Sequence, residues 1–549
     1  MQQLSSLDAT FLFIETPEMP MHAGALQLYE LPAGTRGGFL AAVRRHVKER
    51  LAILPMLRRR LWWMPLNMAN PAWVDAEPDL RRHIVAAPLS RGASMGELEA
   101  AVARLHAERL DRELPLWKFH VFEDLAAEPG GRRRVALYMQ LHHAAFDART
   151  TVELANALMD LSPEPRRLSA KRARQRKVYE LGMSEMLGGV LAGQATRVAG
   201  MIREMPATLG SLRKVAGQAV SYAGLVGAAR ASAALAPATP FNVTLGVERS
   251  FATLTLPRET VQELAQAHGA TLEDMLLTLC GSALRRYLVK RRRLPRKSLI
   301  AAVPVDAPVA GEATDAQAKP RGSVRLVSLG TNVADLLRRL AHVRQSRAPG
   351  KAAPGDGKPS LPADFPSLGV PWLLEAASAL YGRARIAERI PQFANVLVGI
   401  VPGPSMPLYL AGARLLADHP ASFLVHGLAL NVTVQVRAQS LDFGLVADAK
   451  ALPELRELAD AIRIAWDDML ALPRPGERDP AMPGETLVGR AQRAVTDVTG
   501  AMTGVVGGAL TGALGRMTQR VVGSAIDGAV SQVTARLGKP APRKSTKRR

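Results

Sequence analysis

The sequence predicts a mixed α/β (α+β) fold, and three observations support this prediction. Residues 1–165 alternate strand-like and helix-like hydrophobic patterns, and residues 241–478 return to the same alternation. Residues 166–240 and 479–549 carry no strand pattern and are rich in small apolar residues. A chain of 549 residues is also too long for one small core, so several folded units are expected. We therefore expect two α/β segments, a basic helical connector between them and a tail after them.

The first segment contains elements whose hydrophobic period identifies each one as a helix or a strand. A period near 3.6 indicates an amphipathic helix, and a short run of apolar, β-branched and aromatic residues indicates a strand. The prediction is strands at 22–31 and 133–142, and helices at 37–54, 95–110 and 150–161. Thr150 or Thr151 is a plausible N-cap for the last helix, because a hydroxyl can accept a hydrogen bond from the backbone of the first turn.

The second segment repeats the alternation with longer helices. A helical pattern over 258–291 contains Gly269, which predicts a break into two helices. The sequence "LPELRELADAIRIAWDDML" at 452–470 predicts a closing amphipathic helix. The strand predictions are 249–257, 298–305, 395–404, 426–436 and 440–448.

Composition excludes several classes of function. The 71 Lys and Arg against 49 Asp and Glu give a net charge of +22, which favours anionic partners such as lipid surfaces, phosphate-rich ligands or nucleic acid. No aromatic residues interleave with the basic runs and no nucleic-acid-binding motif is present, so we expect no nucleic-acid partner. Cys280 is the only cysteine, which excludes an intramolecular disulfide and a four-cysteine metal site.

The chain carries no signal-peptide pattern and no run apolar enough to predict a membrane span. The connector is interpreted as helices that pack on the body or lie on a membrane surface. The segment 490–538 is apolar with few charges, and it precedes a basic end made of Lys539, Arg543, Lys544, Lys547, Arg548 and Arg549. Together these two weak signals predict peripheral attachment to an anionic membrane or a lipid droplet from the cytoplasmic side, with a helix pair packed on the body or a weakly ordered tail as the alternative.

Two adjacent histidines, His142 and His143, end a predicted strand, and Asp147 follows in the next turn. A neutral imidazole can accept a proton from a hydroxyl, so this pattern is typical of a general base and of the groups that hold it. Structural histidines are the alternative interpretation. Neighbouring residues of a strand point to opposite faces, which argues against one metal ion bound by both rings. No G-x-S-x-G elbow for a nucleophilic serine is present.

The motif resembles the HHxxxDG signature of the bacterial wax ester synthase/diacylglycerol acyltransferase family. Other blocks resemble the same family in the same order. They are "LSSLDATFLFIETPEMPMHAGAL" (4–26), "LPMLRRRL" (54–61), "PAWVDAEPDLRRHI" (71–84), "LDRELPLWKFHVFEDL" (110–125), "EDMLLTLCGSALRRYL" (273–288), "VPGPSMPLYLAGARL" (401–415), "LALNVTV" and "LDFGLVAD". The resemblance therefore extends over most of the chain.

The resemblance implies a fold like that of CoA-dependent acyltransferases of the chloramphenicol acetyltransferase type, with two α/β halves around a central tunnel. It implies transfer of a fatty acyl group from acyl-CoA to diacylglycerol or a long-chain alcohol, with acyl-CoA as substrate and without a cofactor or metal. His143 would be the base, His142 would help to build the site, and Asp147 would hold the motif loop through an unidentified basic residue. The implied substrate-binding residues are Pro115, Leu116, Trp117, Asp274 and Asn431.

Several positions depart from the family pattern. Ala148 stands where the family has glycine, and alanine costs about 1 kcal/mol there if the turn needs a positive φ. Other family polar positions read Glu273, Gly399, Ile400, Val436 and Arg437. These departures are consistent with a different acceptor, a slower enzyme or a lipid-binding paralogue without activity.

Overall fold

A computed structural model describes residues 2–35, 37–63, 70–123, 125–126, 132–166, 236–304, 324–347 and 392–472. The chain divides into two compact units, Met1–Arg474 and Pro475–Arg549. All described residues belong to the first unit, so the predicted tail and most of the predicted connector lie outside them. The C-terminal attachment segment and its basic end therefore remain predictions. None of the helices among the described residues is long and apolar enough to cross a membrane.

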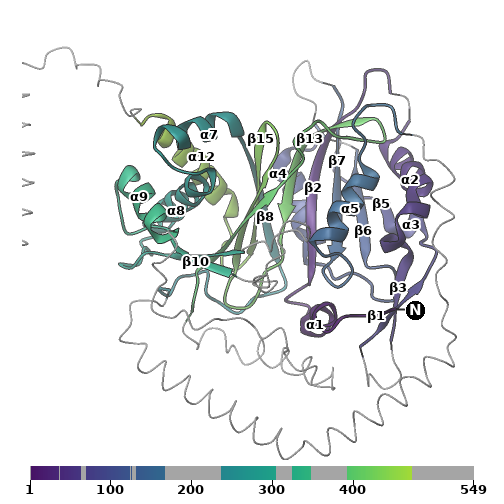
Figure 1. The fold of residues 1–549 in the computed structure, drawn as a ribbon, viewed down its shortest axis with the longest axis horizontal. Coiled ribbons are helices and arrows are strands. Elements are labelled where there is room, and N and C mark those ends of the chain that lie inside the picture. The colour runs from purple at the N-terminus through teal and green to yellow at the C-terminus, as the bar shows by residue number, and fades with distance from the viewer. Residues whose placement is uncertain are drawn as a thin grey trace, which may run out of the picture. The chain divides into compact units, whose positions relative to one another are not determined.

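The N-terminal half contains strands and helices in alternation, as the sequence predicts (Figure 1). Strand β7 is buried on both faces: Leu137 packs in one hydrophobic cluster and Tyr138 in another. The elements of this half are β1 (Gln2–Gln3), α1 (Ser6–Ile14), β2 (His22–Glu30), α2 (Phe39–Arg50), two short 3₁₀ turns (Leu51–Ile53 and Pro55–Arg58), β3 (Arg59–Trp62), β4 (Ala72–Asp75), α3 (Leu80–His83), β5 (Ile84–Ala86), α4 (Met95–Ala107), β6 (Trp117–Phe122), β7 (Arg134–His142) and α5 (Ala148–Leu158).

The C-terminal half has a second sheet that is covered by helices. Gly269 has φ +60° and separates α7 from α8, as predicted from the glycine in the helical pattern. The elements are β8 (Arg249–Pro257), α7 (Arg258–Ala267), α8 (Leu272–Lys290), β9 (Ile300–Pro304), β10 (Val324–Ser328), α9 (Leu336–Arg347), β11 (Val396–Pro402), β12 (Tyr409–Leu410), β13 (Ala413–Ala421), β14 (Leu430–Val436), β15 (Ser440–Asp448) and α12 (Leu455–Leu470).

Two six-stranded sheets organise the described unit. The first has the strand order β12-β13-β2-β7-β6-β5, and the second has the order β10-β9-β11-β14-β15-β8. A small third sheet has the order β1-β4-β3. Strands β12 and β13 follow β11 in the sequence but pair into the first sheet, where β13 runs antiparallel to β2. The C-terminal half therefore completes the sheet that carries the His-His motif.

The two sheets are in close contact where β13 crosses β15. A Cβ atom on Gly444 of β15 would lie 1.7 Å from the backbone oxygen of Pro420 in β13, so only glycine fits at this crossing. Helix α4 joins the halves at a second place, where the buried Glu99 carboxylate accepts hydrogen bonds from the backbone and hydroxyl of Thr253 and pairs with Arg456. These contacts fix the described parts of the two halves to each other.

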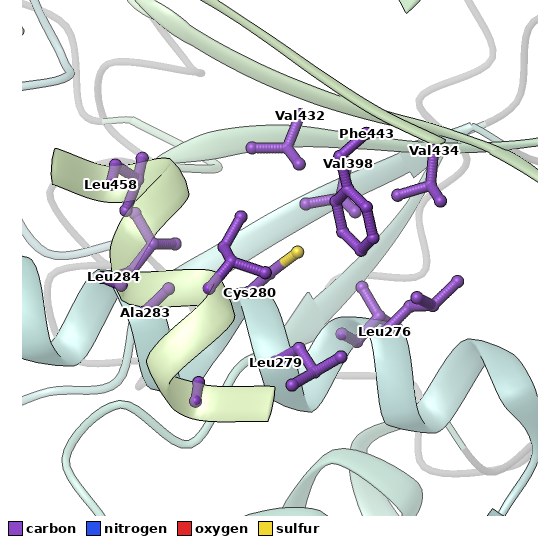
Figure 2. Close-up of a cluster of buried hydrophobic side chains, with 14 of the residues drawn as sticks. Leu276, Leu279, Cys280, Ala283, Leu284, Val398, Val432, Val434, Phe443 and Leu458 are labelled. Atoms are coloured by element: carbon purple, nitrogen blue, oxygen red, sulfur yellow. The ribbon is translucent and has the colours of Figure 1, made fainter. Parts of the chain in front are cut away.

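Cys280 of α8 lies in the largest hydrophobic cluster, against Val398, Val432 and Phe443 of the second sheet (Figure 2). The thiol is buried, and this burial raises its pKa to about 12. A cysteine that stays protonated is a poor nucleophile and metal ligand. Cys280 is therefore a core residue.

Candidate active site

The His-His motif forms a tight turn at the end of β7. The backbone nitrogen of His142 donates to the carbonyl of Leu116, and that of His143 donates to the carbonyl of Met21. The carbonyl of His142 then accepts from the nitrogens of Ala145 and Phe146, which closes the turn. The backbone of both histidines is therefore held by the residue before β6, by the residue before β2 and by its own turn.

The side chain of His142 is fully buried, and its hydrogen-bond partners define its tautomer. Its Nδ1 accepts a hydrogen bond of 3.0 Å from the backbone nitrogen of Ala144, so Nδ1 carries no proton. The ring proton therefore lies on Nε2, 3.5 Å from Oε1 of Glu15. His142 is held between a backbone donor and a carboxylate.

Glu15 is a buried carboxylate that contacts His142 directly and is linked to His143 through Met21. Its Oε1 accepts from the backbone nitrogen of Met21, whose carbonyl holds His143, and its Oε2 accepts from the guanidinium of Arg112. Burial alone would raise the pKa of Glu15, but His142, the Met21 amide and Arg112 together lower it to about 2. Glu15 is therefore ionised at neutral pH.

The ring of His143 lies between two aromatic side chains from distant parts of the sequence. Phe11 of α1 stacks on it at 5.2 Å between ring centroids, and Phe423 meets it edge-on at 4.9 Å. Its Nε2 atom is buried and makes no hydrogen bond to any described residue. Burial, and to a smaller extent the neighbouring His142, lowers the pKa of His143 to about 4. His143 is therefore a neutral imidazole with an unpaired nitrogen at neutral pH.

Asp147 is the N-cap of α5, and this corrects the predicted cap at Thr150 or Thr151. Its Oδ1 accepts from the backbone nitrogen of Thr150 at 2.8 Å and from the hydroxyl of Thr150 at 2.7 Å. A carboxylate at this position satisfies a free donor and lies favourably at the positive end of the helix. The helix therefore starts at Ala148, earlier than the apolar periodicity indicates.

Ala148 is the first residue of α5 and does not have a positive φ. The cost of about 1 kcal/mol that alanine would have in a turn with positive φ therefore does not apply at this position. The departure from the family glycine leaves the backbone of the motif loop unstrained.

Arg59 is a basic residue that contacts the motif turn. Its Nη2 donates to the carbonyl of Ala145 at 2.6 Å, and its guanidinium lies 4.6 Å from the ring centre of Trp73. Burial lowers the pKa of Arg59, and the charges of Asp8 and Asp147 oppose that effect. Nothing in the sequence spacing identifies Arg59, because its partners lie far away along the chain.

Asn431 of β14 reaches the site indirectly. Its Nδ2 donates to the carbonyl of Phe423 at 3.1 Å, and its Oδ1 accepts from the hydroxyl of Thr433. The same loop is held by His106 of α4, whose Nε2 lies 3.2 Å from the carbonyl of Ser422. The C-terminal half therefore positions the aromatic ring that covers His143.

The Pro-Leu-Trp block lies beside the motif, with its side chains in the protein core. Pro115, Leu116 and Trp117 are buried, and the carbonyl of Leu116 is the acceptor for the His142 nitrogen. The indole of Trp117 donates to the carbonyl of Leu57 at 3.0 Å and stacks on His83. In the described structure these side chains support β6 next to the site.

Asp274 lies in the first turn of α8, away from the motif turn. It forms a capping box with Thr271 and a salt bridge with Arg347, and its contacts among the described residues stay within this corner of the second half. Glu273, the other acid of this turn, also pairs with Arg347. The structure thus brings His142, His143 and Asp147 together in one turn, links Asn431 to it through Phe423, and leaves Asp274 elsewhere.

Comparison with known proteins places the chain among lipid acyltransferases. Residues 4–276 match the model of the wax ester synthase/diacylglycerol acyltransferase catalytic domain, and residues 322–469 match that of the C-terminal domain. A putative diacylglycerol O-acyltransferase of Mycobacterium tuberculosis (strain ATCC 25618 / H37Rv) is 33% identical over 472 residues, covering 84% of this chain and 89% of the relative. A probable diacylglycerol O-acyltransferase of the same strain is 31% identical, covering 84% and 97%.

A solved structure has the same fold. The wax ester synthase/diacylglycerol acyltransferase from Marinobacter aquaeolei VT8 is similar with a TM-score of 0.57 at 24% sequence identity, covering 85% of this chain and 98% of that one. The α/β fold class expected from the sequence resemblance is confirmed.

Proposed function

We propose that this chain, which belongs to the wax ester synthase/diacylglycerol acyltransferase family and is an acyltransferase, moves a fatty acyl group from acyl-CoA to diacylglycerol or a long-chain alcohol. The product is a triacylglycerol or a wax ester. The proposal rests on family membership together with one observation, the neutral and unpaired Nε2 atom of His143. Acyl-CoA and the acceptor would reach this atom along a tunnel between the halves.

His143 is proposed to act as the general base. Its Nε2 takes the proton of the acceptor hydroxyl as the oxygen forms a bond to the thioester carbonyl carbon. The C–S bond then breaks, and the imidazolium of His143 returns the proton to the CoA thiolate. The acyl group thus passes directly to the acceptor oxygen, without an acyl-enzyme, a metal or a further cofactor.

His142 and Asp147 are proposed to position the base. His142 links the turn to the ionised Glu15, and Asp147 fixes the start of α5 while its charge faces Arg59. Neither side chain needs to touch the substrate in this scheme. A base held in one orientation loses less freedom when the substrate binds, which favours the transition state.

The substrate-binding assignments are proposed to differ in how directly they act. Asn431 acts through Phe423, whose ring covers His143, and Leu116 and Trp117 shape the wall behind the turn. Pro115 joins this wall, while Asp274 is a substrate-binding candidate only by the family resemblance.

A lipid-binding or acyl-CoA-binding protein without turnover is the alternative, because family polar positions near β11 and β14 are replaced. Gly399 and Ile400 lie on β11, and Val436 and Arg437 lie at the end of β14. Arg437 pairs with the buried Asp442 and donates to the carbonyls of Leu415 and Leu416, which is a structural use of the position.

A substrate panel separates the two functions. The purified full chain is incubated with a long-chain acyl-CoA and, in separate reactions, diacylglycerol, a long-chain alcohol, a short soluble alcohol or water alone. Release of CoA and formation of ester are both measured. Acceptor-dependent formation of one ester per CoA released supports the transferase. Acyl-CoA binding with no acceptor-dependent release in any reaction supports the alternative.

The location is proposed to be the cytoplasmic face of a membrane or a lipid droplet, with peripheral attachment. The proposed acceptors and products are insoluble in water, so the enzyme must collect and deliver them at a lipid surface. The strongly basic composition supports a surface that carries anionic lipid.

A further inference from the structure

The loop that follows α8 concentrates positive charge. Residues 290–297 read KRRRLPRK, so six of the eight are Lys or Arg. Lys290 pairs with Glu457, and Arg291 pairs with both Glu457 and Glu454. These two cations are balanced by two carboxylates, which leaves four cations in the loop.

The remaining cations are exposed, and within the described part of the chain none of them makes an ion pair. They are Arg292, Arg293, Arg296 and Lys297. Cations that stay hydrated and unpaired retain their attraction for an external anionic surface. The loop thus carries about four free positive charges over six residues.

The loop is held in one shape by contacts on its inner side. The Arg291 guanidinium lies 3.7 Å from the ring centre of Tyr287 and pairs with Glu457 of α12. Leu294 packs against the main hydrophobic cluster. Val289, in the last turn of α8, is 50% exposed and adds an apolar side chain beside the charges. Exposed apolar and cationic groups together are the features of a surface that docks on lipid.

Arg292 supplies an independent observation. It has φ +53°, the left-handed conformation that glycine usually provides after a helix. The nitrogen of Arg293 donates to the carbonyl of Leu288 and that of Arg292 to the carbonyl of Val289, which is the Schellman pattern at a helix end. A side chain at this position carries a conformational cost, so a cation is present where glycine would fit without strain.

We propose that residues 292–297, with Val289, form the surface by which this protein docks on the headgroups of an anionic bilayer. The occupant follows from charge complementarity and from the apolar side chain beside the charges. The inference rests on the proposed function for the need of a lipid surface, but binding is measured without turnover. It identifies an attachment surface in the folded body, separate from the C-terminal segment that the sequence suggested.

Sedimentation with vesicles tests the proposal on the full chain. Vesicles of phosphatidylcholine are compared with vesicles in which about a third of the lipid is phosphatidylglycerol. Arg293→Gln/Lys297→Gln should lower partition onto the anionic vesicles about 30-fold, because each cation near such a surface contributes about five-fold. The matched control, Arg45→Gln/Lys48→Gln, removes two exposed cations from α2 and should change partition less than about three-fold.

The Arg292→Gly variant separates the effect of charge on vesicle binding from any effect on the stability of the fold. The variant should keep or raise the midpoint of thermal unfolding, because glycine adopts the left-handed conformation without strain, and still lose about five-fold in vesicle partition. Partition that stays unchanged in Arg292→Gly and in the loop double variant overturns the proposal. Equal losses in the loop and α2 double variants overturn it too, because net charge alone then explains binding.

Two further arms complete the test. Wild-type protein that binds both kinds of vesicle equally contradicts a role for anionic headgroups. Weakened binding of a DNA duplex by the loop variants, with vesicle binding unchanged, would replace the lipid surface with a nucleic acid. Turnover on a short soluble alcohol should be the same in all variants, so loss of the proposed activity and loss of docking are observed separately.

Discussion

Phe11 is expected to control the pKa of the proposed base. Burial has the largest effect on the pKa of His143, and Phe11 is one of two aromatic rings that cover its imidazole. Phe11→Ala admits water on one face of the ring, so the pKa of His143 should rise from about 4 to about 6. At pH 5.5 the neutral fraction of the base then falls from nearly all to about a quarter, while at pH 8 it stays complete.

The assay is the ratio of kcat/KM at about pH 5.5 to that at about pH 8, which reports the titration of the free enzyme. Released CoA is separated by chromatography, because thiol reagents react slowly in acid. The ratio should be close to one for the wild type and about four-fold lower for Phe11→Ala. Phe13→Ala is the matched control, because Phe13 lies on the same helix in the core cluster and makes no ring contact with His143 among the described residues.

An unchanged ratio in a folded Phe11→Ala variant would refute the reasoning. The depressed pKa of His143 would then depend on His142, the second and smaller influence. A similar fall in Phe13→Ala would show that loosening α1, and not uncovering the ring, shifts the titration.

Three further outcomes are expected from the geometry. Gly444→Ala should lower the free energy of urea unfolding by about 3 kcal/mol or more, because its Cβ would collide with the backbone of β13; a small loss would refute the close crossing. Gly96→Ala, whose Cβ would lie 4.0 Å from the Ser94 hydroxyl oxygen, should raise it by roughly 0.5–1 kcal/mol. Ala148→Gly should lose roughly 0.5 kcal/mol and gain no activity, since its φ is not positive; increased activity would contradict that backbone. His106 and His120 are buried with pKa values of about 4, below the ordinary 6.5, so the unfolded chain binds more protons than the folded one between these pH values. The free energy of unfolding should therefore fall as the pH drops from 6.5 toward 4, by about 2 kcal/mol for each residue at pH 5. Unfolding midpoints that match at pH 7.5 and 5 would show that these rings are not buried as neutral groups.

Local patterns predicted the elements well because they depend on neighbouring residues. The strand predicted at 440–448 is β15 with the same bounds, and the helix break at Gly269 is present. The predicted cap of α5 was wrong because the carboxylate of Asp147, and not a threonine hydroxyl, accepts the hydrogen bond from a free backbone nitrogen of the first turn. A hydroxyl and a carboxylate near a helix start are both plausible caps, and only the backbone path distinguishes them.

Contacts between distant segments could not be predicted in the same way. No periodicity indicates that β13 leaves the second half to pair with β2, since the partner of a strand is not encoded in its own alternation. The covering of His143 by Phe423 depends on that crossing, because Phe423 is the second residue after the end of β13. The motif thus pointed to His143 as the proposed base, while the surroundings of its ring could be described only from the fold.

Turnover of His143→Gln is the measurement that tests the central claim most directly. The full-length variant is compared with the wild type for ester formation from acyl-CoA and the preferred acceptor, and its folding is checked by thermal unfolding. Loss of the general base should lower kcat/KM by about 10²–10⁴-fold while the protein stays folded. A folded His143→Gln variant with turnover within about three-fold of the wild type would contradict His143 as the base.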